Sequence, residues 1–214
     1  MTKNEKIRLL IGVVINLIIF GLEVFCLCLF IYYLRNNIGY SRFMFFTNIS
    51  NLTTGLISLA VSIFLIISLV KNKVIYPLAL TIFKVIGLTM TTLTFIAVLT
   101  VLAPLTSFTY MYGNERFITH LLTPLLALVS FLFFENKSLF KWSHTFFGMI
   151  PFVIYSIVYA ICVIILKVWP DIYQVNKQGI WYVYLIGAAI MAFGCTQGIY
   201  FLKKLVNKKV FKAN

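Results

Sequence analysis

The run that indicates the fold class most clearly spans residues 43–70 and reads FMFFTNISNLTTGLISLAVSIFLIISLV. It contains no charged residue, and a helix of this length, at about 1.5 Å per residue, crosses about 30 Å of hydrocarbon. Its polar residues are all Thr, Asn or Ser. We therefore expect a transmembrane helix that carries a polar side.

Runs of the same kind occupy most of the remaining chain. The six expected spans lie at about 9–34, 43–70, 77–103, 117–134, 145–168 and 180–202. The connections between them are short, so we expect a single all-α, polytopic membrane domain over 1–214, with 203–214 as a basic tail. The first run is longer than the apolar part of a secretory signal, and no small-residue cleavage pattern follows it, so we expect it to be a membrane helix.

The composition excludes several classes of protein. Of the 214 residues, 62% are hydrophobic and 11% are charged, whereas a soluble domain carries about 25% charged residues. A soluble domain, a disordered chain and a nucleic-acid-binding module are therefore excluded, although the net charge is +13. The cations flank the apolar runs, as they do in membrane proteins. The richness in Lys and Ile is typical of a low-GC bacterium, so we expect the cell membrane of a bacterium.

The basic residues are divided unequally between the two sides of the expected bundle. Short loops rich in Lys and Arg stay on the cytoplasmic side of a membrane. One side carries twelve such residues: Lys3, Lys6, Arg8, Lys71, Lys73, Lys137, Lys141, Lys203, Lys204, Lys208, Lys209 and Lys212. The other side carries five: Arg35, Arg42, Arg116, Lys167 and Lys177. Both termini are therefore expected in the cytoplasm.

Polar residues of the second expected helix recur with helical spacing. Five of them fall on one face: Thr47, Asn51, Thr54, Ser58 and Ser62. Small polar residues let membrane helices pack closely, and this explains Ser58 and Ser62 most simply. Asn48 and Asn51 are bulkier and need hydrogen-bond partners, so both packing and a functional polar site remain open for them.

A threonine and a histidine are expected at the same depth near the outer surface. Thr47 lies one turn into the second helix and His120 one turn into the fourth. A hydroxyl beside an imidazole is the minimal form of an activated nucleophile, because the imidazole accepts the proton as the oxygen attacks a carbonyl. The amides of Asn48 or Asn51 can then stabilise the oxyanion. Thr123 would add a hydroxyl to the same polar pocket, while a purely structural His120 stays open as the alternative.

Two charged residues fall well inside the expected spans, away from their ends. Glu23 lies midway along the first span, and Lys84 lies about two turns into the third. Charged side chains within a membrane usually pair with one another, so Glu23 and Lys84 form a candidate buried ion pair. Lys84 can alternatively extend toward the lipid headgroups, because it lies near the start of its helix.

The sequence offers little for metal or disulfide chemistry. All four cysteines fall within the spans: Cys26, Cys28, Cys162 and Cys195. This placement favours apolar packing over a disulfide framework or a CxxC metal pair. A catalytic zinc needs about three protein ligands, whereas His120 and His144 are expected on opposite sides of the membrane. We expect no metal and no cofactor.

Two motifs resemble the signatures of a known family. They are FFTNISNL at 45–52 and HLLTP at 120–124. Both resemble the androgen-induced-gene family of six-helix membrane proteins and its bacterial relatives. Glu135, Trp142 and the Trp169–Pro170 pair are similar to features of the family's loops.

The resemblance implies an activity and two site residues. It implies hydrolysis of fatty acid esters of hydroxy fatty acids, with Thr47 as the nucleophile and His120 as the base. Under this implication, Glu115 or Asp171 is available to orient the imidazole.

Three functions remain open from the sequence. The leading one is an intramembrane hydrolase of lipid-like esters, whose acyl chains would lie among the 21 Phe and 12 Tyr side chains. The second is a non-enzymatic carrier or binder of a lipid or small molecule, in which Glu23 and Lys84 form a coupling pair. The third is a scaffold whose basic tail, Lys203 to Lys212, binds anionic lipid. Membrane lipids are the expected partners in each, nucleic acid is not, and the oligomeric state is left undetermined.

Overall fold

The computed structural model describes residues 1–36, 44–135, 140–173, 176, 179 and 181–209 of the chain. Within these ranges the regular structure is helical and contains no strand, which confirms the all-α class. Four of the cations counted above lie outside the described residues: Arg42, Lys137, Lys177 and Lys212.

Six helical segments of the described chain are long and apolar enough to cross a membrane, which confirms the predicted number. The first two are the single helices α1 (Lys3–Arg35) and α2 (Phe46–Val70), and the last is α9 (Trp181–Lys209). The third joins α3 (Leu78–Ala97) to the π-helical turn η2 (Val98–Leu102). The fourth consists of α6 (Glu115–Phe117), η3 (Ile118–Leu122), α7 (Thr123–Val129) and η4 (Ser130–Phe134), and the fifth of η5 (Trp142–Thr145), α8 (Phe146–Ala160) and η6 (Ile161–Ile165). The short helices α4 (Ala103–Leu105) and α5 (Phe108–Tyr112) connect the third span to the fourth.

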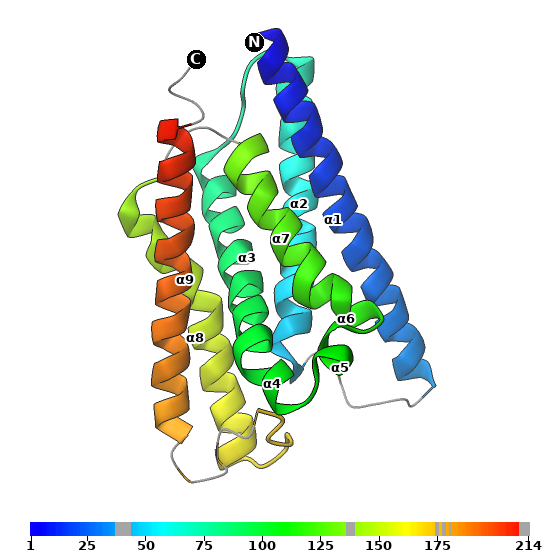
Figure 1. Cartoon of the computed structure of the whole chain (residues 1–214), viewed down its shortest axis with the longest axis vertical. Helices are drawn as coiled ribbons and strands as arrows, with labels where there is room; N and C mark the ends of the chain where they lie inside the picture. Colours follow the sequence, from blue (N-terminus) through cyan, green and yellow to red (C-terminus); the bar gives the residue numbers. More distant parts are fainter. Residues whose placement is uncertain (37–43, 136–139, 174–175, 177–178, 180, 210–214) are drawn as a thin grey trace.

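The two ends of the bundle are distinguished by the course of its first and last helices (Figure 1). α1 begins and α9 ends at one end, called the termini end below, whereas α1 ends and α2 begins at the opposite, far end. The predicted boundaries differ most at the last span, because α9 continues past residue 202 to Lys209. Much of the predicted basic tail is therefore helical.

α3 is the central helix of the bundle, in contact with α2, α7, α8 and α9 (Figure 1). Small residues allow this close packing. Thr54 Oγ1 of α2 donates to the carbonyl of Gly87 at 3.1 Å, and a Cβ added at Gly87 would lie 3.0 Å from that same oxygen. Within the predicted polar stripe, Thr54 thus serves the packing of α2 against α3.

The backbone of the fourth span opens at two places. Ile118–Leu122 and Ser130–Phe134 are π-helical turns, and Pro124, just after the first, has no N–H to donate. The second turn is closed by a bond from the Glu135 N–H to the Ser130 carbonyl at 3.2 Å. Turns of this width displace side chains from ordinary helical positions, and here they carry His120 and lead into Glu135.

Candidate functional site

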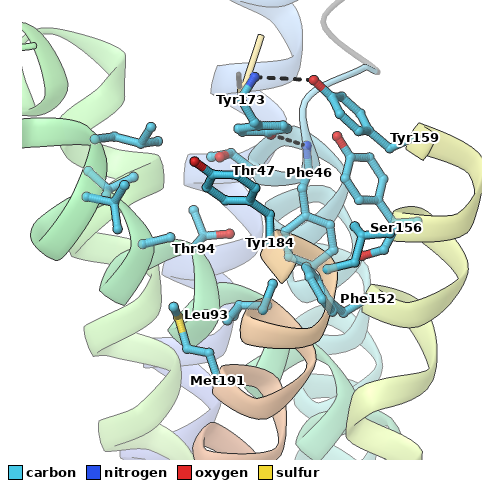
Figure 2. Close-up of a pocket in the computed structure, with 17 residues that line it drawn as sticks. Phe46, Thr47, Leu93, Thr94, Phe152, Ser156, Tyr159, Tyr173, Tyr184 and Met191 are labelled. Atoms are coloured by element: carbon cyan, nitrogen blue, oxygen red, sulfur yellow. Dashed lines mark hydrogen bonds between the residues drawn. The ribbon is translucent and has the colours of Figure 1, made fainter. Parts of the chain in front are cut away.

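A cavity of about 220 Å³ lies in the far-end half of the bundle, between α2, α3, α8 and α9 (Figure 2). Its walls are almost wholly apolar or aromatic. The lining residues are Phe46, Thr47, Leu93, Thr94, Ala97, Val98, Val101, Leu102, Phe152, Tyr155, Ser156, Tyr159, Tyr173, Tyr184, Leu185, Ala188 and Met191. An apolar cavity with a few polar groups is the usual form of a small-molecule site.

Tyrosine hydroxyls hold one end of this cavity together. Tyr155 donates to the Met44 carbonyl at 2.5 Å, and the Phe46 N–H donates to the Tyr173 hydroxyl at 3.1 Å. The Tyr173 N–H in turn donates to the Tyr159 hydroxyl at 3.2 Å, the bond drawn at the top of Figure 2. Burial raises the pKa of Tyr173, so its phenol stays neutral. These bonds fix the aromatic rings around the cavity before any ligand enters.

Thr47 lines the cavity, as the depth argument allowed, but His120 is not among the lining residues. Within the described chain, the Thr47 hydroxyl makes no hydrogen bond. His120 Nδ1 lies 2.7 Å from the Met111 carbonyl, and since a carbonyl can only accept, Nδ1 carries the proton and Nε2 is the basic nitrogen. Among the described residues, no hydrogen bond therefore joins Thr47 to His120.

The remaining polar residues of the predicted site bind the fourth span to its neighbours. Asn51 Nδ2 donates to the Thr47 carbonyl at 2.8 Å and to the Thr119 carbonyl at 3.1 Å. Asn48 lies one turn nearer the start of α2 and is half-buried. The Thr123 hydroxyl was predicted in the same polar pocket, but it donates to Glu23 Oε1 of α1 at 2.6 Å.

A backbone carbonyl orients the imidazole. His120 Nδ1 lies at hydrogen-bond distance from the Met111 carbonyl. Asp171, one of the two predicted orienting groups, accepts from the Tyr159 hydroxyl at 3.0 Å and from the Asn176 N–H at 2.8 Å. The role predicted for Glu115 or Asp171 in orienting the ring stays a prediction.

The predicted ion pair between Glu23 and Lys84 is wrong. Lys84 Nζ lies 3.0 Å from Glu135 Oε1, and both side chains are fully buried. Glu23 is instead bound by the Thr123 hydroxyl. Lys84 also does not extend to the headgroups, because it donates to Asn16 Oδ1 at 2.7 Å inside the bundle.

Glu135 is the centre of a buried polar cluster at the termini end. Its Oε1 accepts from Ser130 at 2.8 Å and from Asn16 Nδ2 at 3.1 Å, and its Oε2 accepts from the Tyr76 hydroxyl at 2.7 Å. Arg8 donates to its carbonyl. Burial alone would raise the pKa of Glu135, but Lys84 and the hydroxyls of Tyr76 and Ser130 outweigh it and hold that pKa below its ordinary value. We call Asn16, Tyr76, Lys84, Ser130 and Glu135 the ionic cluster.

Lys203 closes the same end of the bundle. The sequence placed it in the basic tail, but the structure buries it to 1% exposure. Its ammonium donates to the Phe131 carbonyl at 2.6 Å and the Leu132 carbonyl at 3.3 Å. These carbonyls belong to the final π-helical turn of the fourth span, where helix carbonyls lack partners.

Sequence reasoning missed Asn16, Tyr76 and Ser130 as partners of a buried carboxylate, and the tyrosines around the cavity. A signal for Asn16 was present, because it is the one amide within the long apolar run 9–34. A signal for Glu135 was also present, since it directly follows an apolar span. The tyrosine arrangement had none, because it joins α2, α8 and the segment before α9.

Metal chemistry finds no support in the described part of the chain, where no three His, Cys, Asp or Glu side chains group as ligands. Comparison with family models, curated proteins and solved structures gives no match. The similarity to the androgen-induced-gene family accordingly stays a resemblance of the two motifs.

Proposed function

We propose that the protein is a membrane carrier that binds a lipid-like amphiphile in the far-end cavity. The observation that supports this most directly is the cavity itself, with apolar walls along four helices and tyrosine hydroxyls at one end. An acyl or alkyl chain fits the apolar walls, and a polar headgroup fits the hydroxyl end. If the termini are cytoplasmic, as the distribution of cations predicts, the cavity lies in the outer half of the membrane.

The contrast between the two halves of the bundle favours a carrier over a static binder. The far-end half contains a cavity, whereas the termini-end half is closed by the ionic cluster and Lys203. A carrier alternates between two states, each open toward one side only. The described arrangement matches one such state, with the ionic cluster as the closed side.

Ligand binding is tested by filling the cavity. Ala97 lines it, whereas Leu99, in the same span, is 42% exposed and is not among the lining residues. A photoactivatable phospholipid in nanodiscs should label α8 and the first turns of α9 in a saturable way. Ala97→Phe should remove this labelling and Leu99→Phe should preserve it, as mapped by mass spectrometry of the peptides.

The binding proposal fails if labelling is not displaced by excess unlabelled lipid. It also fails if Ala97→Phe, folded as judged by an unchanged melting temperature, labels like the wild type. Labelling of lipid-facing residues on the outside of the same helices serves as the internal reference.

Ester hydrolysis in the same cavity is the second candidate, and the position of Thr47 favours it. Thr47 lines the space in which an amphiphile would lie, and His120 keeps a basic Nε2 on the fourth span. No hydrogen bond joins His120 to Thr47 among the described residues, so hydrolysis requires Nε2 to come within hydrogen-bond distance of the Thr47 hydroxyl. For this reason we propose ester hydrolysis only as the second candidate, after lipid carriage.

The isosteric variants Thr47→Val and Thr94→Val separate the two candidates. Both residues line the cavity, but only Thr47 is the expected nucleophile. If hydrolysis occurs, release of fatty acid from a fatty acid ester of a hydroxy fatty acid should vanish in Thr47→Val and persist in Thr94→Val. Equal rates in both variants would exclude Thr47 as nucleophile.

A further inference from the structure

Six aromatic rings line the cavity: Phe46, Phe152, Tyr155, Tyr159, Tyr173 and Tyr184. Several are packed ring to ring. The Phe46 and Tyr155 centroids lie 5.0 Å apart, those of Tyr159 and Tyr173 5.2 Å apart. Figure 2 shows the labelled rings around one space: Phe46, Phe152, Tyr159, Tyr173 and Tyr184. Aromatic faces carry negative potential, and a group of them around one space attracts a cation.

The charges near the cavity agree with this preference. No Lys, Arg or His is among its lining residues. The carboxylate of Asp171 accepts from the hydroxyl of the lining residue Tyr159. An anion could bind the N–H groups at the start of α2, but the Phe46 N–H is already donated to Tyr173. The lining thus offers an anion no cationic side chain and offers a cation several aromatic rings.

We propose that the amphiphile carries a quaternary ammonium headgroup, which the aromatic rings of the cavity bind. This rests on the proposed function and specifies its ligand class. A quaternary ammonium is diffuse and weakly hydrated, and has no N–H that must find an acceptor, so apolar and aromatic walls suffice for it. A primary ammonium is strongly hydrated and would need acceptors, most of which are used here by bonds within the protein.

The test compares two ligands of the same shape that differ in charge alone. They are the octyl ether of choline and its carbon isostere, 3,3-dimethylbutyl octyl ether. Ethers are used because they cannot be hydrolysed, so binding is measured without turnover. Saturable binding to protein in nanodiscs, corrected for binding to empty nanodiscs, gives a Kd for each ligand. Decanoate, an anionic amphiphile, is measured in the same way for comparison.

Tyr184 provides the cleanest variant, since it lines the cavity and no hydrogen bond of its hydroxyl is described. Tyr184→Leu removes the ring, and Tyr184→Phe keeps it. Tyr182→Leu is the matched control, because Tyr182 lies two residues away, is 51% exposed and does not line the cavity. One cation–π contact at a part-exposed site corresponds to about a 2- to 5-fold change in affinity.

We expect the wild type to bind the cation at least fivefold more tightly than its isostere. Tyr184→Leu should reduce that ratio about 2- to 5-fold, while Tyr184→Phe and Tyr182→Leu should preserve it. Equal binding of the two ethers, or tighter binding of decanoate, would overturn the ligand class and leave the carrier proposal standing. Saturable binding of none of the three, together with no effect of Ala97→Phe on lipid labelling, would overturn both.

Discussion

Glu135 illustrates what a charged side chain requires inside an apolar bundle. It is fully buried, yet its two oxygens are bound by the side chains of Asn16, Tyr76, Ser130 and Lys84. Burial and the nearby Glu135 carboxylate raise the pKa of Tyr76 well above its ordinary value, so that phenol remains a donor. The carboxylate is thereby held ionised beside Lys84.

Removal of one partner of this pair should destabilise the protein strongly. Lys84→Met leaves the Glu135 carboxylate buried without its cation, which typically costs about 3–5 kcal/mol. The double variant Lys84→Met/Glu135→Gln should recover part of that loss, because no uncompensated charge remains. Thermal unfolding in detergent measures both, with the exposed Lys71→Met as control. Equal stability of Lys84→Met and the wild type would contradict the pairing.

Acid should weaken the same cluster. Because the folded pKa of Glu135 is depressed, its contribution to stability is present above its unfolded pKa, about 4.3, and is lost as pH falls through the folded value. The wild type should therefore lose more stability between pH 7 and pH 3 than Glu135→Gln does. Melting temperatures at the two pH values give the comparison. Parallel losses in both proteins would show that Glu135 is not the group responsible.

The sequence identified Lys84 as a buried charge but not its partner. The pairing with Glu23 rested on these being the two charges well inside the expected spans. Glu135 lies just past the end of a span, where a side chain normally reaches the membrane surface. The wide π-helical turn before it, closed by the Glu135 N–H and the Ser130 carbonyl, directs it back into the bundle. A π-helical turn of this kind produces no periodic pattern of residues, so the sequence could not predict it.

Among the elements, α3 depends on small residues at its contacts. Gly148 of α8 lies against it, and a Cβ at that position would approach Thr89 Oγ1 to 2.6 Å and Thr196 Cγ2 to 2.7 Å. These distances are shorter than atoms of real side chains permit. The close contact among α3, α8 and α9 therefore requires a glycine at position 148.

Gly148→Ala should lower the free energy of unfolding by about 1–3 kcal/mol, because α8 must move away from α3 and α9. Gly187→Ala in α9 is the matched control, since a Cβ there meets nothing within 4 Å. It should be neutral or slightly stabilising. Chemical denaturation of the two variants distinguishes them. A neutral Gly148→Ala would show that the three helices are less closely packed than described.

Hydropathy predicted the helices well because each span must satisfy its own backbone in hydrocarbon. The predicted Phe43 to Val70 run became α2, Phe46–Val70, and the other spans shifted mostly at their ends. The contents of the candidate site were predicted less well. Thr47 was expected at a functional site and lines the cavity, whereas His120 is turned toward Met111. Helix depth could place the two side chains in one layer, but the direction of each depends on the local turn.

At the scale of the whole molecule, the sidedness of the bundle is a prediction from its cations. α1 begins and α9 ends at the same end of the bundle (Figure 1), and the excess of Lys and Arg at that end predicts that it faces the cytoplasm. In a cysteine-free background, Val168→Cys at the far end should react with a membrane-impermeant maleimide added to intact cells. Lys73→Cys at the termini end should react only after permeabilisation. The reverse pattern would invert the bundle and place the cavity in the inner half.

The measurement that most directly tests carriage is uptake of the radiolabelled octyl ether of choline into proteoliposomes. Its permanent charge slows passage through bare lipid, so protein-dependent flux is resolved. We predict saturable uptake by the wild type and by Leu99→Phe, and loss of uptake in Ala97→Phe, in which the cavity is filled. Uptake by Ala97→Phe at the wild-type rate, or no uptake by a folded wild type that binds the ligand, would contradict the account.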